Sequence, residues 1–322
     1  MHAILIKLDK SLTWSEVPSP IRKENEIIME VHAAALNRAD LLQREGNYPS
    51  PKDWPEWMGL EVSGLVIEAP EEGRWQIGDK VCALLGGGGY AEKVAVPVNL
   101  VLPVPNGLSL VEAAAIPEVF MTAYLNLVIE GELKIGETVF IQAGASGLGT
   151  AAIQLAKLIG AKVITTVGSD EKANFVLGLG ADVVINRKKE DVANILEKYK
   201  VNLAIDCVAG PALGDCLKSM DRGGRWIVLA TLGGDISKID MTDFFKRGIR
   251  LIGSTLRSRS LSMKADILSR LEQELWPKFS SGELRVIIHE ELPIQNAEEA
   301  QAILRQNKNI GKVVLVNKNF MI

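Results

Sequence analysis

The chain has 322 residues, of which 47% are hydrophobic and 24% are charged, which is the composition of a folded globular protein. This length predicts about two domains. The net charge of −4 gives no strong basic field for a nucleic-acid backbone. Three cysteines are too few and too scattered for a disulfide framework and fit a reducing compartment, while three histidines nearly exclude a histidine-rich metal centre.

The first ten residues alternate between apolar and polar side chains, which favours a strand over a signal peptide. No apolar run in the sequence approaches the ~18 residues that a membrane-spanning helix needs. We therefore expect a cytoplasmic protein with no membrane partner.

Residues 1 to about 115 consist of short apolar runs separated by turn residues. Runs of this kind lie at 26–31, 62–67 and 80–85. Short strands with frequent turns predict a small β-rich domain, either a barrel or a sandwich.

From about residue 117 to 258, short runs rich in Val and Ile alternate with segments of helical spacing. The predicted strands are Thr138–Ala143, Lys162–Val167, Asp182–Asn186, Asn202–Cys207, Arg225–Ala230 and Ile249–Ser254. Strict alternation implies right-handed crossovers and therefore a doubly wound α/β domain with a parallel sheet.

The last sixty residues resemble the first region more than the middle one. They predict a helix over Lys264–Phe279, a strand over Leu284–Ile288, a helix over Ala297–Gln306 and a strand over Lys312–Asn317. The simplest interpretation is a discontinuous first domain, residues 1–117 and 259–322, into which an α/β domain, residues 118–258, is inserted.

A glycine-rich turn, Gly144–Gly149, follows the first strand of the α/β region and opens its first helix. In that position the glycines permit a tight turn, and the helix N-terminus offers N–H groups to a pyrophosphate. The turn is not a phosphate-binding loop of the Gly-Lys-Ser/Thr type, because Thr150 follows Gly149, and Leu148 excludes a hydrolase elbow. Ser146 replaces the middle glycine of the strict dinucleotide fingerprint. The alternative is a turn without a ligand, but the five further strands favour dinucleotide binding.

The end of the second strand favours NADP over NAD. An NAD site usually has an acidic residue there, whereas this strand ends in Val167. Ser169 and Lys172 follow, and Arg187–Lys189 comes after the third strand, so a 2′-phosphate would meet a hydroxyl and cations. Asp170 has two alternatives. A contact to the ribose would argue against NADP, whereas a cap on the next helix would not. The alternative for Arg187–Lys189 is an ordinary run of solvated charges without a ligand.

Several stretches together resemble one protein family over nearly the whole chain. They are residues 34–41, 59–64, 120–124, 144–155, 256–259 and 307–312. The chain resembles the zinc-independent quinone oxidoreductases of the medium-chain dehydrogenase/reductase superfamily, which include zeta-crystallin, and is most similar to their tumour-suppressor-inducible subgroup. The resemblance implies an α/β protein with a GroES-like β-rich catalytic domain and a Rossmann domain. It also implies a homodimer joined through the Rossmann edge strand, here Ile249–Ser254.

The resemblance also implies that no metal is used. In zinc-dependent relatives a cysteine and a histidine occupy the positions that match Asn37 and Leu60, and these two residues are poor zinc ligands. The structural zinc lobe with its four cysteines is missing from the sequence.

Carried over residue by residue, the resemblance predicts the NADP(H) contacts. Arg187 stands where relatives often have a tyrosine, and an arginine keeps the preference for NADP. The predicted cofactor-binding residues are Asn37, Thr122, Gly144, Ser146, Gly147, Leu148, Gly149, Gly168, Ser169, Lys172, Arg187, Val208, Thr231, Leu232, Gly233, Gly234, Leu256 and Asn309.

Reduction of a quinone needs a hydride donor and neutral hydrogen-bond donors that stabilise the resulting oxyanion. The candidate catalytic residues are Tyr48, Ser146 and Asn37, with Asp40 in the same loop region as Asn37. Each has a structural alternative. In these alternatives Tyr48 only packs beside prolines, and Ser146 only bonds the loop backbone or the pyrophosphate. For Asp40 the alternatives are a pair with Arg38 or a helix cap.

Two further features have equally open interpretations. Trp54 and Trp57 either line a planar aromatic site or pack on the barrel, and Gly86–Gly89 is either a mobile lip or a hairpin turn.

The sequence predicts NADPH-dependent reduction of quinones by hydride transfer. A reductase of activated C=C bonds in enals or enones uses the same cofactor and is not separated from it by the sequence. A cofactor-binding protein with a structural or nucleic-acid role is the alternative from another class, and the net charge argues against it.

Overall fold

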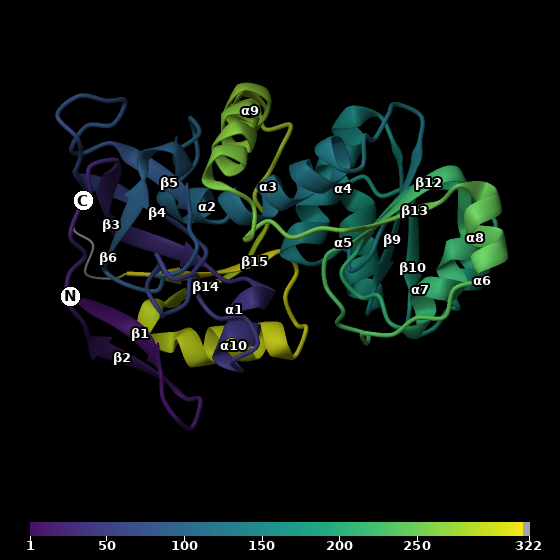
Figure 1. The fold of residues 1–322 in the computed structure, drawn as a ribbon, viewed down its shortest axis with the longest axis horizontal. Coiled ribbons are helices and arrows are strands. Elements are labelled where there is room, and N and C mark those ends of the chain that lie inside the picture. The colour runs from purple at the N-terminus through teal and green to yellow at the C-terminus, as the bar shows by residue number, and fades with distance from the viewer. Residues whose placement is uncertain (318–322) are drawn as a thin grey trace. The chain divides into compact units, whose positions relative to one another are not determined.

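The computed structural model of the protein describes residues 1–317 and consists of two compact units (Figure 1). The first contains residues 1–121 together with residues 259–317, and the second contains residues 122–258. No sheet is shared between the two units among the described residues.

The first unit is built on a seven-stranded sheet in the order β14-β15-β3-β4-β5-β7, with β6 also paired to β3. Strand β15 pairs antiparallel with β3, so segments from before and after the second unit contribute to one sheet. The strands are β3 (Glu26–Ala35), β4 (Glu61–Glu68), β5 (Lys80–Leu84), β6 (Lys93–Pro97), β7 (Val101–Pro103), β14 (Ile288–Pro293) and β15 (Lys312–Val316).

A separate two-stranded sheet and a set of helices complete this unit. Their bounds are β1 (His2–Ile6), β2 (Leu12–Glu16), α1 (Arg38–Arg44), η1 (Val98–Leu100), α2 (Leu110–Ala114), α3 (Pro117–Tyr124), α9 (Leu261–Ser280), η4 (Ile294–Asn296) and α10 (Ala297–Arg305). Helix α3 runs past the end of the unit at residue 121 and continues into a π-helical turn, η2 (Leu125–Ile129).

The second unit has a six-stranded, wholly parallel sheet in the order β10-β9-β8-β11-β12-β13, which confirms the predicted doubly wound fold. Its strands are β8 (Thr138–Ile141), β9 (Lys162–Val167), β10 (Val183–Asn186), β11 (Val201–Asp206), β12 (Met220–Val228) and β13 (Arg250–Gly253). Its helices are α4 (Gly147–Ile159), α5 (Asp170–Gly178), α6 (Val192–Leu196), α7 (Pro211–Cys216), η3 (Leu217–Ser219) and α8 (Met241–Arg247).

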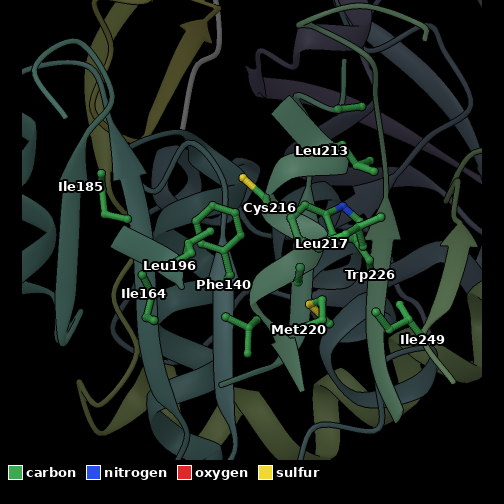
Figure 2. Packing of buried hydrophobic residues seen from close by; sticks show 13 residues of the cluster. Phe140, Ile164, Ile185, Leu196, Leu213, Cys216, Leu217, Met220, Trp226 and Ile249 are labelled. Carbon is green, nitrogen blue, oxygen red and sulfur yellow. The ribbon is translucent and has the colours of Figure 1, made fainter. Parts of the chain in front are cut away.

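The core of the second unit contains a cluster of buried side chains from the sheet and its helices (Figure 2). Phe140 of β8 and Trp226 of β12 pack with ring centroids 5.9 Å apart. The Trp226 indole N–H donates to the buried Asp206 carboxylate at 2.9 Å, so this large ring has its polar atom satisfied. These two contacts link the central strands β8, β11 and β12.

The predicted strand over Leu284–Ile288 is wrong. The backbone N–H of Leu284 donates to the Lys278 carbonyl at 3.0 Å, so Leu284 completes the C-terminal end of α9, and its side chain is buried. The strand begins at Ile288 and pairs parallel with β15. The apolar run at 284–288 resembles a strand in sequence because a helix end also buries such residues.

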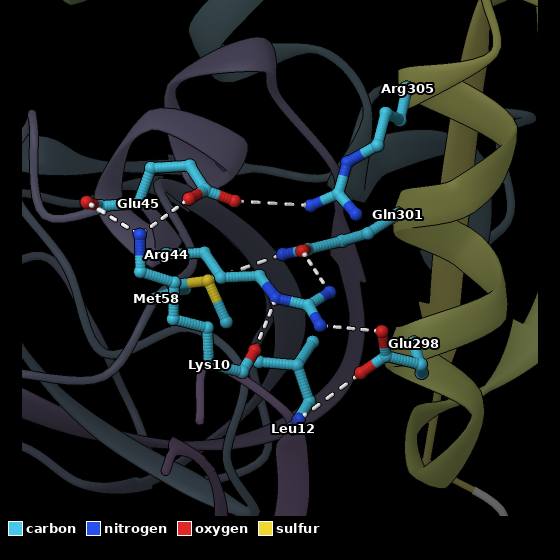
Figure 3. A network of polar contacts seen from close by, with 8 residues as sticks. All are labelled: Lys10, Leu12, Arg44, Glu45, Met58, Glu298, Gln301 and Arg305. Atoms are coloured by element: carbon cyan, nitrogen blue, oxygen red, sulfur yellow. Dashed lines mark hydrogen bonds and ion pairs between the residues drawn. The ribbon is translucent and has the colours of Figure 1, made fainter. Parts of the chain in front are cut away.

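Helix α1 is anchored to α10 by a polar network (Figure 3). The Arg44 guanidinium, largely buried, donates to the Lys10 carbonyl at 2.6 Å, to Gln301 Oε1 at 3.1 Å and to Glu298 Oε1 at 2.5 Å. Glu298 also accepts from the backbone N–H of Leu12 at 3.1 Å. This network fixes the helix that begins directly after Asn37.

Candidate functional site

Most of the predicted cofactor contacts lie on the loops at the carboxyl edge of the parallel sheet. The strand order reverses between β8 and β11, and loops diverge at such a point. The loops after β8, β9, β10, β11, β12 and β13 all leave this edge because the strands are parallel.

The turn after β8 tolerates no side chain at two of its glycines. A Cβ on Gly144 would lie 2.1 Å from Thr165 Oγ1, and a Cβ on Gly149 would lie 2.4 Å from the Ala143 carbonyl oxygen. Ser146 is the N-cap of α4, and its Oγ accepts from the backbone N–H of Gly149 at 3.0 Å. The loop-bonding alternative for Ser146 is thus present in the structure.

The loops after β9 and β10 bring a hydroxyl and cations together. Ser169 is the N-cap of α5, and Arg187 Nη2 would lie 3.3 Å from a Cβ on Gly168. Asp170 forms an ion pair with Lys189 and accepts from Asn186 Nδ2 at 2.8 Å, and these bonds lower the pKa of its carboxyl. The acidic residue that could have taken a ribose is therefore engaged by protein groups.

The loops after β11 and β12 are shaped by Asp206, which the sequence analysis did not single out. Its carboxylate accepts from the backbone N–H groups of Val208 at 2.7 Å and Ala209 at 2.8 Å, in addition to Trp226. Burial raises its pKa. Gly233 packs on Val208, since a Cβ there would lie 2.9 Å from Val208 Cγ1. The two loops therefore support each other.

The first unit contains a buried polar cluster, which we define as Asn37, Asp40, Glu61, Tyr90, Glu118 and Lys312. At its centre the fully buried Glu61 carboxylate receives three donors. They are Lys312 Nζ at 2.7 Å, Asn37 Nδ2 at 3.1 Å and the backbone N–H of Glu118 at 2.9 Å. The Lys312 ammonium also donates to Asn37 Oδ1 at 2.8 Å and to the Leu36 carbonyl. These bonds satisfy a charge pair that would otherwise be costly to bury.

Asp40 is the second buried carboxyl of the cluster. It accepts from the backbone N–H of Asn37 at 2.7 Å, from Tyr90 OH at 2.8 Å and from the backbone N–H of Gly59 at 3.3 Å. Burial raises its pKa to about 6 despite these donors. Asp40 does not pair with Arg38, whose guanidinium donates to Asn307 Oδ1 at 2.7 Å.

Glu118, near the start of α3, is the only carboxyl of the cluster that is partly exposed. Burial, and next the nearby Glu61 carboxylate, raise its pKa to about 8. A carboxyl in this state carries a proton at neutral pH.

The segment Gly86–Gly89 is fully buried, so it is packed rather than a mobile lip. A Cβ on Gly86 would lie 2.5 Å from the Trp54 indole, and Trp57 Nε1 donates to the Gly88 carbonyl at 3.0 Å. Both tryptophans pack on this segment. A Cβ on Gly59, whose φ is +109°, would likewise clash with the backbone of Gly89. Tyr90 directly follows Gly89, and its hydroxyl donates to Asp40.

The remaining predicted residues are distributed over both units. Tyr48 is half-buried in the segment that follows α1. Thr122 is half-buried on α3, and the Asn309 side chain donates to the Gly311 carbonyl at 2.7 Å. Leu256 is buried beyond β13. The roles given to these residues stay predictions.

The sequence analysis missed Glu61, Glu118 and Lys312, although a signal was present. Each is a charged residue beside or within an apolar run that the fold buries. A buried charge of this kind needs a partner, so the pairing of Glu61 with Lys312 could have been searched for across the chain.

Among residues 1–317 no group of three or more His, Cys, Asp and Glu side chains is arranged to hold a metal ion. Within the same range, no helix has both the length and the apolarity that a bilayer crossing requires.

Both units, one β-rich and one doubly wound with a glycine-rich turn, are matched by family models of dehydrogenases. The family model for the alcohol dehydrogenase GroES-like domain matches residues 23–106, and that for zinc-binding dehydrogenases matches residues 147–273.

Named relatives agree with this class. The chain is 30% identical over 320 residues to quinone oxidoreductase-like protein 2 of Bos taurus, and the alignment covers 97% of this chain and 91% of that protein. It is 30% identical over 312 residues to quinone oxidoreductase of Sus scrofa, covering 94% and 92%. The crystal structure of JamJ enoyl reductase superposes with a TM-score of 0.86 at 25% identity, covering 98% and 99%. The chain belongs to the quinone oxidoreductase-like family of the medium-chain dehydrogenase/reductase superfamily.

Proposed function

We propose that the protein is an NADPH-dependent, zinc-independent reductase of quinones. The observation that carries the cofactor part is the pairing of Asp170 with Lys189, which leaves Ser169 and Arg187 beside Gly168. The quinone part is supported by the two relatives named quinone oxidoreductase and quinone oxidoreductase-like protein.

The residues at the carboxyl edge of the sheet fit a nicotinamide dinucleotide. The N-terminus of α4 presents backbone N–H groups to a pyrophosphate, and Ser169, Lys172 and Arg187 supply a hydroxyl and cations for a 2′-phosphate. When bound, the reduced nicotinamide supplies a hydride. We place the nicotinamide half beside Gly233 and the loop that the Asp206 carboxylate bonds.

The donors at the two positions that match zinc ligands do not fit zinc. Leu60 has no donor atom and is buried, and Asn37 Oδ1 is bonded to the Lys312 ammonium. An ammonium in contact with this oxygen opposes a second cation there. The proposed reaction therefore uses hydrogen-bond donors rather than a Lewis acid.

The structure narrows the candidates for stabilising the oxyanion. Both hydrogens of the Asn37 amide are committed, one to Glu61 Oε1 at 3.1 Å and one to the Ala35 carbonyl at 3.3 Å. Ser146 accepts from Gly149 through its oxygen, so its own hydrogen is not used in that bond. We therefore assign the donor role to Ser146 and Tyr48 and give Asn37 no donor role, because its amide hydrogens bond Glu61 and Ala35.

The dimer belongs to the same proposal. Strand β13 is at the edge of the parallel sheet and its Leu251 side chain is 43% exposed. A second copy pairing along β13 would cover this strand. The expectation of a cytoplasmic location stays a prediction.

Reduction of activated C=C bonds is the second candidate, favoured by the similarity to an enoyl reductase. The test is oxidation of NADPH by the purified protein with an ortho-quinone, a para-quinone and an aliphatic enone. We expect turnover with the quinones. Turnover with the enone alone would move the protein to the C=C reductases. Binding of NADPH without any turnover, together with retention of labelled RNA, would favour the non-enzymatic alternative.

A further inference from the structure

The Lys312 side chain places an ammonium group inside the first unit, where three oxygens surround it. The residue is buried, and its Nζ donates to the Leu36 carbonyl, to Asn37 Oδ1 at 2.8 Å and to Glu61 Oε1 at 2.7 Å. An ammonium has three hydrogens to donate and no acceptor, so three oxygens satisfy it completely. One backbone carbonyl, one amide and one carboxylate thus enclose a single positive charge.

The first two of these oxygens are held in place by bonds that do not involve the ammonium. The backbone N–H of Leu36 donates to the Val313 carbonyl at 2.9 Å, which fixes the chain at the end of β3. The backbone N–H of Asn37 donates to Asp40 Oδ2 at 2.7 Å, as part of the capping box of α1. The turn that carries the Leu36 carbonyl and the Asn37 amide is therefore fixed from both sides.

The carboxylate oxygen is held in the same way. Glu61 lies on β4 and pairs with Leu84 of β5, and its other oxygen, Oε2, accepts from the backbone N–H of Glu118 at 2.9 Å. Asn37 Nδ2 donates to Glu61 Oε1 at 3.1 Å, so the amide turns its oxygen toward the ammonium and its nitrogen toward the carboxylate. The three oxygens are thus preorganised around one point.

The charges around this point are mostly negative. Burial raises the pKa of Asp40 and of Glu118, and the Lys312 charge opposes the rise at both groups. Lys264 of α9 also acts on Glu118. Without Lys312, the fully buried Glu61 carboxylate would have no counter-ion bonded to it, which is costly. The site therefore requires a positive charge.

We propose that the Leu36 carbonyl, Asn37 Oδ1 and Glu61 Oε1 form a binding site for a primary ammonium ion, and that Lys312 is its tethered occupant. The first unit thereby carries a cation that cannot dissociate. The inference concerns this unit alone and does not depend on the proposed reductase activity. Lys312→Ala removes three methylene carbons and the ammonium, which together correspond to n-propylammonium. The variant should therefore bind this ion from solution.

The test is chemical rescue of the full-length Lys312→Ala variant. Its melting temperature is measured at pH 7 against n-propylammonium chloride, with tetramethylammonium chloride keeping the ionic strength constant. Tetramethylammonium has the same charge but no N–H group to donate. We expect a saturable rise in melting temperature, of about 1–4 °C at about five times the dissociation constant. Wild type, whose site is filled, should melt at the same temperature in both salts.

Three variants show whether the effect belongs to this site. Lys312→Met fills the space without a charge, and Lys312→Ala/Glu61→Gln removes the negative oxygen, so neither should respond to n-propylammonium. Lys80→Ala is the matched control, because Lys80 is exposed on β5 of the same unit. An equal response in these variants, or no response of Lys312→Ala, would overturn the inference. If Lys312→Ala folds only with an amine present, its refolding yield is measured instead, and equal yields in the two salts would overturn it.

A second measurement uses folded wild type and needs no rescue. In protein labelled with ¹⁵N-lysine, a buried ammonium bonded to three oxygens exchanges its hydrogens slowly with water. We expect a slowly exchanging ammonium resonance at pH 7 that is missing from the double variant Lys312→Met/Glu61→Met. The absence of such a resonance from the wild-type spectrum would contradict the assignment of Lys312 as the occupant.

Discussion

The polar cluster of the first unit and the cation-bearing edge of the second unit use charge in opposite ways. In the cluster, Lys312 and Glu61 are 4% and 0% exposed and depend on each other. At the sheet edge, Arg187 and Lys189 are exposed and water screens them. A buried charge changes the stability of the fold and the pKa of neighbouring groups, whereas an exposed charge changes the affinity for a charged ligand. Substitutions in the two regions should therefore be detected by different measurements.

The largest effect is expected from Lys312→Met. It leaves the buried Glu61 carboxylate without its counter-ion, so the free energy of unfolding should fall by about 3–5 kcal/mol. Denaturant unfolding at pH 7 measures this. The double variant Lys312→Met/Glu61→Met, which removes both charges, should recover most of the loss. Equal losses in the single and double variants would show that the pair does not act as a unit.

The next effect concerns the sheet edge and leaves the fold intact. Arg187→Ala removes a charge-assisted contact worth about 1.5–3 kcal/mol, so the dissociation constant of NADPH should rise about 10- to 150-fold. Binding of NADH and the melting temperature should be unchanged. Lys172→Ala should weaken NADPH in the same selective way. A parallel loss of NADH affinity would instead show that the loop itself had been damaged.

Glu118→Gln should change the pH dependence of stability. The folded pKa of Glu118, about 8, lies above its ordinary value of 4.5, so the folded state binds the proton more tightly. Its contribution is therefore fully present below pH 4.5 and is lost as the pH rises to 8. Since Gln does not titrate, the variant should gain on wild type by on the order of 1–3 kcal/mol between pH 5 and pH 9. Unfolding curves at both pH values test this, and a constant difference would contradict the assignment.

The smallest effect is expected from Lys189→Ala, which breaks the exposed ion pair with Asp170. The free energy of unfolding should change by less than about 1 kcal/mol. Asp170 then becomes available to a ribose, so the KM for NADH should fall by less than about fivefold while that for NADPH rises. An unchanged NADH KM would mean that Asp170 plays no part in the choice of cofactor.

The sequence predicted the parallel sheet well because each strand is a short, buried, β-branched run between helical segments. Lys162–Val167 was placed correctly to the residue. The strand at 284–288 was misplaced because burial of Leu284 at a helix end leaves the same apolar pattern as a strand. Local patterns identify burial more surely than they identify the element that provides it.

The site was predicted less evenly, for a related reason. The glycine-rich turn and the residues after β9 are local in sequence, so a local pattern was enough to propose them, and their roles stay predictions. The cluster joins Asn37, Glu61 and Lys312 across 275 residues, as the Lys312–Asn37 bond shows. No local pattern reports such a pairing. Asp40 caps its helix, as one alternative predicted, by accepting from the backbone N–H of Asn37, but its bond to Tyr90 of a distant segment has no local signal.

The most direct test of the central claim compares the two cofactors in one assay. Oxidation of NADPH and of NADH by the purified wild-type protein is followed with a para-quinone, and the hydroquinone formed is quantified. We predict equimolar hydroquinone and a kcat/KM at least about tenfold higher with NADPH, the factor that corresponds to about 1.4 kcal/mol. Equal or faster oxidation of NADH, or the absence of hydroquinone with both cofactors, would contradict the account.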